Sequence, residues 1–268
     1  MKNIRKALQH SNRIVVKVGT STLTYDTGKI NFTRIDKLAR VLSDLSNQGR
    51  EVILVTSGAI GVGVDKLKMK EKPVSIPEKQ AVAAVGQCEL MHVYSKLFAD
   101  YSHIVAQILL TKDVIEEEQR RENVENTFEA LMQKGIIPIV NENDSVSVDE
   151  IKFGENDTLS AIVAKLINAD LLIILSDIEG FYNSDPRKNP DAKMISIIEE
   201  ITPAIEKSAG GAGSKRGTGG MATKVIAAKI ATEANVNMVI ASGKNPDIIM
   251  DIVNGKDVGT LFVARSGT

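Results

Sequence analysis

The sequence predicts an α/β protein, a three-layer α/β/α sandwich around a mainly parallel central sheet. Short runs rich in valine, isoleucine and leucine alternate along the chain with longer segments whose apolar residues recur at helical spacing. Near-continuous apolar strands indicate a sheet that is buried on both faces, as parallel sheets are. No internal repeat and no proline-rich linker divides the 268 residues, so we expect a single domain over 1–268.

Six strands are expected, at 13–19, 51–58, 103–110, 135–143, 170–177 and 235–243. The first helix is predicted between the first two strands, where apolar residues recur from Ile35 to Leu45 and Gly49 follows as a C-cap. Further helices are predicted at about 77–100, 121–134, 157–168, 219–234 and 246–254. In open parallel sheets, ligands bind outside the carboxyl ends of the strands, so the strand ends are the candidate site.

Composition and charge exclude several classes of function. The chain is 43% hydrophobic and 25% charged, as is usual for a globular protein, and its net charge of −1 provides no positive field for nucleic acid or acidic membrane. No apolar run approaches the ~20 residues of a membrane span, and the N-terminus lacks the apolar region of a signal peptide. The single Cys88 favours a reducing compartment. We therefore expect a cytoplasmic protein without nucleic-acid or membrane partners.

The first two strands end in glycine-bearing segments. In "VVKVGTST", Lys17 lies inside an apolar run, where an unpaired ammonium would be costly; it either reaches solvent at the sheet edge or joins Gly19 and the next hydroxyl residues in a phosphate-contacting turn. In "VTSGAIGVG", Ser57 and Gly58 follow the strand. The glycines there either bring backbone N–H groups to a ligand at a helix N-terminus or allow a tight turn with close helix packing.

The next strand ends are polar. "NEND" places Asn141 and Asp144 after an apolar strand, either as ordinary turn residues or as donors and acceptors for a small polar substrate. "FGENDTLSA" places Asn156 and Asp157 at a helix start, where a carboxylate can cap the helix and also hold a lysine or magnesium.

The last candidates surround a glycine-rich stretch. Ser176 and Asp177 end the fifth strand, and the loop after them is suited to covering a nucleotide base and ribose. In "GGAGSKRGTGGMATK" (210–224), Lys224 falls in the first turns of a helix, where a cation opposes the helix dipole. It points either to solvent or to an anion at the helix end. We expect 208–216 to be a mobile lead-in and 217–224 to be the phosphate-contacting part.

These residues favour phosphoryl transfer. The sequence contains no GxxxxGK[ST], no GxGxxG after the first strand, no protein-kinase signature and no His/Cys cluster for zinc. Cys88 lies in the middle of a predicted helix and is expected to be a residue of the protein core rather than a nucleophile. Glycine-bearing strand ends, two lysines and nearby carboxylates fit a reaction that depends on positioning and charge neutralisation. No histidine lies in a motif, so the sequence is compatible with a carboxylate acceptor, which is already ionised at neutral pH and can attack without a base.

Together these segments resemble the amino-acid kinase family. The resemblance covers almost the whole chain, in the family's order: "KVGTST" (17–22), "VTSGAIGVG" (55–63), "NENDSV" (141–146), "FGENDTLSA" (153–161), "LSDIEGFY" (175–182) and "GTGGMATKVIAA" (217–228). Members that act on N-acetylglutamate or aspartate usually carry a glycine pair after the first lysine, and those that act on UMP a Ser-Gly. "KVGTS" favours the members that phosphorylate glutamate. The alternatives are an acetylglutamate or aspartate kinase, and a non-catalytic amino-acid or nucleotide sensor on the same fold.

The resemblance implies ATP-dependent phosphorylation of the L-glutamate side-chain carboxylate to γ-glutamyl phosphate, the first step of proline biosynthesis. It implies Lys17 and Lys224 as catalytic residues that bracket the phosphoryl group, with Asp157 orienting both. The implied substrate residues are Ser57, Gly58, Asn141, Asp144 and Asn156. The implied ATP-site residues are Lys17, Ser176, Asp177, Thr218, Gly219, Gly220, Met221, Ala222, Thr223 and Lys224.

The resemblance also implies Mg²⁺ on the ATP phosphates, with no protein ligand assigned. Proline as a feedback inhibitor, a homodimer or homotetramer, and glutamyl phosphate reductase as the next enzyme are further family expectations. The sequence departs from the family pattern in two places. We expect no C-terminal PUA domain of the kind that many bacterial members carry, since "GTLFVARSGT" is the last segment, and Glu155 stands where an aspartate is often found.

Overall fold

The central sheet has the strand order β3-β4-β2-β1-β5-β7-β8-β6. The computed structural model describes residues 2–25, 27–111, 116–146, 156–184, 186, 189–210 and 220–265. The strands are β1 (Arg13–Val18), β2 (Glu51–Val55), β3 (Val105–Leu110), β4 (Ile137–Glu142), β5 (Leu171–Ser176), β6 (Ile197–Ile198), β7 (Asn237–Ser242) and β8 (Thr260–Phe262). Neighbouring strands are parallel except β7 and β8, which are antiparallel. The predicted mainly parallel sandwich is confirmed.

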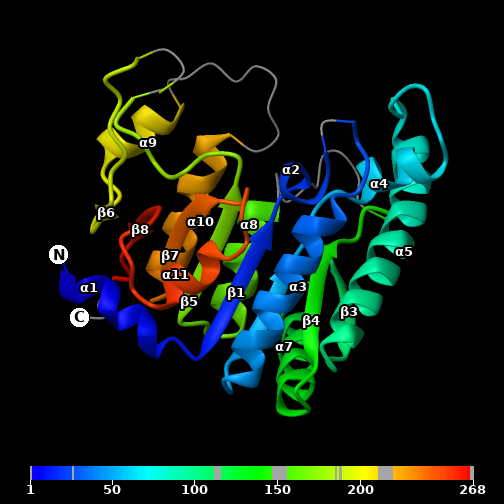
Figure 1. Ribbon diagram of the computed structural model, residues 1–268, viewed down its shortest axis with the longest axis horizontal. Coiled ribbons are helices and arrows are strands. Elements are labelled where there is room, and N and C mark those ends of the chain that lie inside the picture. Colours follow the sequence, from blue (N-terminus) through cyan, green and yellow to red (C-terminus); the bar gives the residue numbers. More distant parts are fainter. Residues whose placement is uncertain are drawn as a thin grey trace.

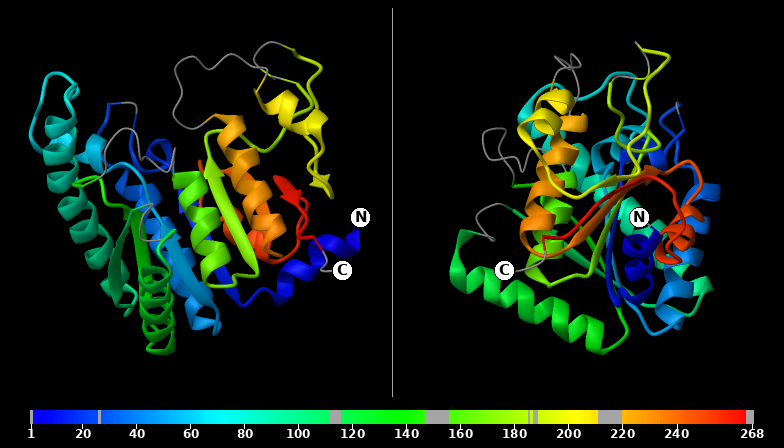
Figure 2. Two further views of the ribbon diagram at one scale, coloured as in Figure 1. Left: turned by 180° about the vertical axis from the view of Figure 1, so that it is seen from behind. Right: turned by 90° about the vertical axis from the view of Figure 1, so that its left-hand side faces the viewer.

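Helices cover both faces of the sheet (Figures 1 and 2). The helices are α1 (Lys2–Lys6), α2 (Thr20–Leu23), α3 (Phe32–Asn47), α4 (Ala59–Lys66), α5 (Ile76–Asp100), α7 (Glu118–Gln133), α8 (Asn156–Leu166), α9 (Pro203–Gly210), α10 (Met221–Glu233) and α11 (Ile248–Val253), with the 3₁₀ turn η1 (Ala7–His10) after α1. Helices α3, α5 and α11 pack on one face, and α7, α8 and α10 on the other. No helix among the described residues is both long and apolar enough to cross a membrane.

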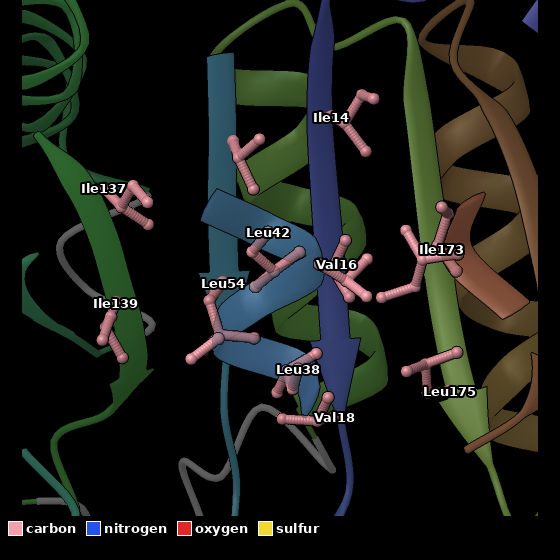
Figure 3. Close-up of a cluster of buried hydrophobic side chains, with 14 of the residues drawn as sticks. Ile14, Val16, Val18, Leu38, Leu42, Leu54, Ile137, Ile139, Ile173 and Leu175 are labelled. Atoms are coloured by element: carbon pink, nitrogen blue, oxygen red, sulfur yellow. The ribbon is translucent and has the colours of Figure 1, made fainter. Parts of the chain in front are cut away.

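Side chains of each inner strand alternate between the two cores. On β1, Ile14, Val16 and Val18 face the α3 side, where they pack with residues of β5 and α3 such as Ile173 and Leu38 (Figure 3). Val15 joins the core under α8 and α10. Period-two alternation therefore turns the next odd-numbered residue of β1, Lys17, toward α8 and α10.

The order of the strands explains where a site can form. The chain places β2, β4 and β3 on one side of β1, then crosses to β5 and β7 on the other side. Helix α8 makes that crossover between β4 and β5, so its N-terminus lies at the carboxyl edge of the sheet. Such a switch of direction beside β1 leaves a crevice in which ligands of open α/β sheets bind.

Several short elements were not predicted. Helices α1 and α2 are only five and four residues long, and β6 and β8 only two and three, too short for a periodic pattern. The segment after Lys17 that was predicted as a turn contains Gly19, which is the N-cap of α2. The mobile lead-in predicted at 208–216 is wrong for Ser208, Ala209 and Gly210, which end α9; residues 211–216 lie outside the described residues.

Candidate active site

Lys17 lies near the carboxyl end of the central strand β1. Its neighbours in register are Val55 on β2 and Ile174 on β5, so hydrogen-bonded strands flank it on both sides. The residue is only 8% exposed, and its ammonium folds back over Gly19, where an added Cβ would lie 3.5 Å from Nζ. The alternative in which Lys17 reaches solvent is wrong.

A buried carboxylate joins Lys17 to Lys224. Asp157 lies in the first turn of α8 and is 0% exposed. Its Oδ1 is 2.7 Å from Lys17 Nζ, and its Oδ2 is 3.0 Å from Lys224 Nζ. One carboxylate from α8 therefore fixes two ammonium groups, one from β1 and one from α10. We call these three residues the charged cluster.

The pKa of Asp157 shows which effect wins in the charged cluster. Burial on its own would raise the pKa of this carboxyl, because it disfavours the charged form. The charges of Lys17 and Lys224, and their hydrogen bonds, outweigh burial and hold the pKa of Asp157 below its ordinary value. Asp157 is therefore ionised at neutral pH, which suits it to holding the two lysines rather than to accepting a proton.

Lys224 enters the charged cluster from the first turn of α10. The helix begins at Met221, with Gly220 as its N-cap in an extended conformation. Lys224 is 4% exposed, so the alternative in which it points to solvent is wrong. Thr223 links the start of α10 to Asp157. Its hydroxyl donates to the Gly220 carbonyl at 2.8 Å and lies 3.4 Å from Asp157 Oδ2.

A neutral network begins at the residue before Asp157. The Nδ2 of Asn156 lies 2.6 Å from the Thr56 carbonyl, 2.9 Å from Ser57 Oγ and 2.8 Å from Asn141 Oδ1, and its two hydrogens are shared among these three acceptors. The ends of β2 and β4 supply these partners, because both strands end at the same edge of the sheet. We call Ser57, Asn141, Asn156 and their partners the amide network.

A small cavity of about 180 Å³ opens against the amide network. It is lined by Thr20, Gly58, Ala59, Ile60, Gly61, Asn141, Glu142, Asp144 and Asn156. At about 30 Å³ for each water, this space holds a handful of waters, and it is smaller than the usual sites of drug-sized ligands. Its size and polar lining suit a small polar molecule. The structure thus brings Gly58, Asn141, Asp144 and Asn156 together, with Ser57 bonded to Asn156.

The glycines of α4 and α5 allow the close helix packing that one of the two alternatives predicted, and Gly58 lies at the cavity. Gly58 has φ of 97°, a left-handed conformation that favours glycine, and it lines the cavity. A Cβ added at Gly63 would overlap the Val82 carbonyl, and one added at Gly86 would overlap the Ala59 carbonyl. The later glycines therefore allow α4 and α5 to pack closely, which fixes the start of α4 beside the cavity.

The expected nucleotide residues lie on the other side of β1. Ser176 ends β5, and its hydroxyl donates to Asp177 Oδ1 at 2.9 Å. Gly220, Met221, Ala222 and Thr223 form the start of α10. Thr218 and Gly219 lie outside the described residues, as does Glu155. Among the described residues, no group of three or more His, Cys, Asp or Glu could hold a metal ion.

Two residues were missed or misplaced by sequence reasoning. Gln87 on α5 joins the amide network, because its Oε1 accepts from Asn141 Nδ2 at 2.8 Å. A mid-helix glutamine carries no motif that would single it out. The prediction of Cys88 as a core residue is wrong, since Cys88 is exposed. The buried residues of α5 recur as Ala83, Gly86, Gln87 and Leu90, and helical spacing leaves Cys88 off that face.

Comparison with known proteins agrees with this arrangement. The sequence profile of the amino acid kinase family matches residues 12–242. The chain is 64% identical to glutamate 5-kinase of Clostridium perfringens (strain 13 / Type A), over 98% of this chain and 100% of that protein. It is 60% identical to glutamate 5-kinase of Listeria innocua serovar 6a, over 98% of this chain and 96% of that protein.

Solved structures with low sequence identity share the fold. Carbamate kinase from Giardia lamblia bound to AMP-PNP superposes with a TM-score of 0.69 at 19% identity, covering 95% of this chain and 99% of that one. UMP kinase from Bacillus anthracis gives a TM-score of 0.63 at 17% identity, covering 96% and 97% of the two chains. The profile match and the highly identical relatives carry the assignment beyond fold: this chain belongs to the amino acid kinase family.

Proposed function

We propose that the protein transfers the γ-phosphoryl group of ATP to the side-chain carboxylate of L-glutamate, forming γ-glutamyl phosphate and ADP. A carboxylate oxygen of glutamate attacks the γ-phosphorus, and the bond from that phosphorus to the oxygen bridging to the β-phosphate breaks. The observation that carries the proposal is the buried charged cluster beside a small polar cavity, in a chain highly identical to glutamate 5-kinases.

The charged cluster is suited to the phosphoryl group. Lys17 and Lys224 are fixed by Asp157 in a largely buried site, where charge interactions are stronger than in water. We assign them to the charge on the transferring group, and Asp157 to holding them in place. No general base is assigned, because a carboxylate acceptor with a reference pKa of about 4 is already ionised at neutral pH.

The cavity is suited to the amino-acid end of glutamate. The first hydrogen bond of α4 runs from the Val62 N–H to the Gly58 carbonyl, so the N–H groups of Ala59, Ile60 and Gly61 have no carbonyl partner within the helix. These donors at the positive end of the helix dipole would hold the α-carboxylate. Asp144 would attract the α-ammonium.

The neutral polar groups of the cavity complete the proposed glutamate site. Ser57, Asn141 and Asn156 supply hydroxyl and amide groups, and Gly58 lets the backbone approach the substrate.

ATP would lie on the β5 and α10 side. Ser176, Asp177 and residues 218–224 are proposed to line its site, with Lys17 and Lys224 at the phosphates. Mg²⁺ is proposed to accompany the ATP phosphates, as the family resemblance implies, and no protein ligand or step is assigned to it.

Other expectations stay proposals. These are the first step of proline biosynthesis, feedback inhibition by proline, a homodimer or homotetramer, glutamyl phosphate reductase as the next enzyme, a single domain over 1–268 and a cytoplasmic location. Light scattering tests the assembly, and titration of turnover with proline tests the inhibition.

The deciding experiment is a coupled ADP-release assay with glutamate, N-acetylglutamate, aspartate and UMP as acceptors. We expect ATP turnover with glutamate and trapping of the acyl phosphate by hydroxylamine. Turnover only with another acceptor would overturn the choice of substrate. Glutamate binding without turnover would instead support the non-catalytic sensor.

A further inference from the structure

The amide network extends beyond the cavity to a buried glutamine on α5. Gln87 Oε1 accepts a hydrogen bond from Asn141 Nδ2 at 2.8 Å, and both residues are buried. Asn141 lines the cavity, whereas Gln87 does not. Through this hydrogen bond to Asn141, Gln87 can act on a bound substrate without touching it.

The direction of every hydrogen bond in this network follows from a single backbone group. The Thr56 carbonyl can only accept, so the Asn156 side chain must turn its Nδ2 toward it. The same Nδ2 then faces Asn141, which must present Oδ1. Asn141 consequently turns Nδ2 toward Gln87, and Gln87 must present Oε1. Each amide fixes the orientation of the next, from the end of β2 to α5.

This order determines what the cavity offers to a ligand. The three contacts of Asn156 within the network are all made by Nδ2, so its Oδ1 lies at the opposite end of the amide. Asn156 lines the cavity, and a carbonyl oxygen presented there is an acceptor for a cationic donor. Reversal of Asn141 would set its Nδ2 against that of Asn156, two donors in contact.

We propose that Gln87 is a positioning residue that holds Asn141 from the side opposite Asn156, so that the orientation set by the Thr56 carbonyl is kept at both asparagines and the cavity presents acceptor oxygen to the α-ammonium of an amino-acid substrate. The inference rests on the proposed function, because it takes glutamate as the ligand. It adds a residue that touches no substrate but sets the specificity for an amino group.

The test compares apolar and polar replacements at position 87. Gln87→Met keeps length and lacks a strong acceptor, Gln87→Leu is a second apolar variant, and Gln87→Glu retains an oxygen facing Asn141. Gln133→Leu on α7 is the matched control, since Gln133 is exposed and its Nε2 donates to Glu129 Oε1 away from the cavity residues. Thermal unfolding identifies the variants that fold.

We expect Gln87→Met and Gln87→Leu to raise the KM for glutamate about tenfold or more, while the KM for ATP and kcat change less than about twofold, as for loss of one buried hydrogen-bond partner. Gln87→Glu should recover most of the glutamate KM, and Gln133→Leu should match the wild type. An unchanged glutamate KM in the folded apolar variants, or an equal rise in the KM for ATP, would overturn the inference.

The same series separates this inference from the proposed function. Wild-type turnover with glutamate tests the function itself. A wild type active on glutamate, together with unaffected apolar variants, removes only the role of Gln87. A wild type that does not phosphorylate glutamate removes the proposed function, and this inference with it.

Discussion

The charged cluster and the amide network are neighbours that work by different physics. Lys17, Asp157 and Lys224 interact through full charges in a largely buried site, so their attraction is strong and only weakly directional. The amide network is neutral, and its contacts depend on which end of each amide faces which partner. Charge suits a transferring phosphoryl group, and direction suits the selection of a substrate.

The two regions meet at consecutive residues of one helix. Asn156 and Asp157 open α8, where successive side chains point about 100° apart. One side chain therefore joins the amide network, and the other reaches the two lysines. The crossover of α8 from β4 to β5 places this first turn beside β1, so a single helix start aligns both halves of the site.

The largest expected effect is the loss of a cation from the charged cluster. We expect Lys224→Ala to abolish turnover while the protein stays folded, and Lys17→Ala to lower turnover at least ~10²-fold, as for removal of a transition-state charge contact. Steady-state kinetics measure both effects. Lys229→Ala is the matched control on the same helix, because Lys229 is exposed and pairs with Glu206 at 3.0 Å. Wild-type-like turnover of Lys224→Ala would remove that lysine from the mechanism.

Neutralising the shared carboxylate should cost stability as well as activity. We expect Asp157→Asn to lower the free energy of unfolding by about 3–5 kcal/mol at neutral pH, because two buried ammonium groups lose their counter-charge. Urea unfolding measures the change.

The pH dependence of that loss gives a sharper test. Since the pKa of Asp157 is lowered from 3.8 in the folded protein, its stabilisation is complete above about pH 4 and is lost as the pH falls through the lower folded value. The difference between wild type and Asp157→Asn should therefore shrink below about pH 4. A difference that grows on acidification would contradict the assigned direction of the shift.

A smaller effect is expected where the helices beside the cavity pack. Gly86→Ala should lower the free energy of unfolding by about 1–3 kcal/mol, because the added methyl overlaps the Ala59 carbonyl even though alanine favours helix. The displaced start of α4 should also raise the KM for glutamate more than the KM for ATP. Chemical denaturation and kinetics check the two effects; a stabilised variant would show that the contact is absent.

The smallest effect is expected at Cys88. Because its side chain is exposed on α5, Cys88→Ala should change the free energy of unfolding by less than about 0.5 kcal/mol and leave both KM values unaltered. This variant is also the control for Gly86→Ala on the same helix. A loss of activity in Cys88→Ala would show that the outer face of α5 contributes to the site.

Much of the fold could be predicted, because the inner strands are buried on both faces and appear as apolar runs such as "RIVVKVG". Helices such as α3 could be predicted because their buried apolar residues recur at helical spacing along one face. Strands β6 and β8 could not be predicted, because two or three residues are too few to show a periodic pattern. Pairing with neighbouring strands holds them in the sheet. Cys88 was misplaced because it lies among apolar residues in "AVGQCELMHV", whereas helical spacing leaves it off the buried face of α5.

The two halves of the site differed in how far they could be predicted. Lys17 was singled out because an unpaired ammonium in an apolar run is costly, and Lys224 because a cation at a helix N-terminus opposes the helix dipole. Asp157 was singled out by its position at a helix start in "FGENDTLSA". Gln87 could not be found, because a neutral amide at a helix position carries no unusual cost or pattern. Its role depends on contacts with Asn141, more than fifty residues away in the sequence.

The most direct test of this division of labour is two-substrate kinetics on Asn156→Ala. The account predicts a KM for glutamate raised about tenfold or more, with the KM for ATP changed less than about twofold, because the altered residue serves the amide network alone. An equal rise in both KM values, or a rise in that for ATP only, would contradict the claim that consecutive residues of α8 divide the site between substrate and phosphoryl group.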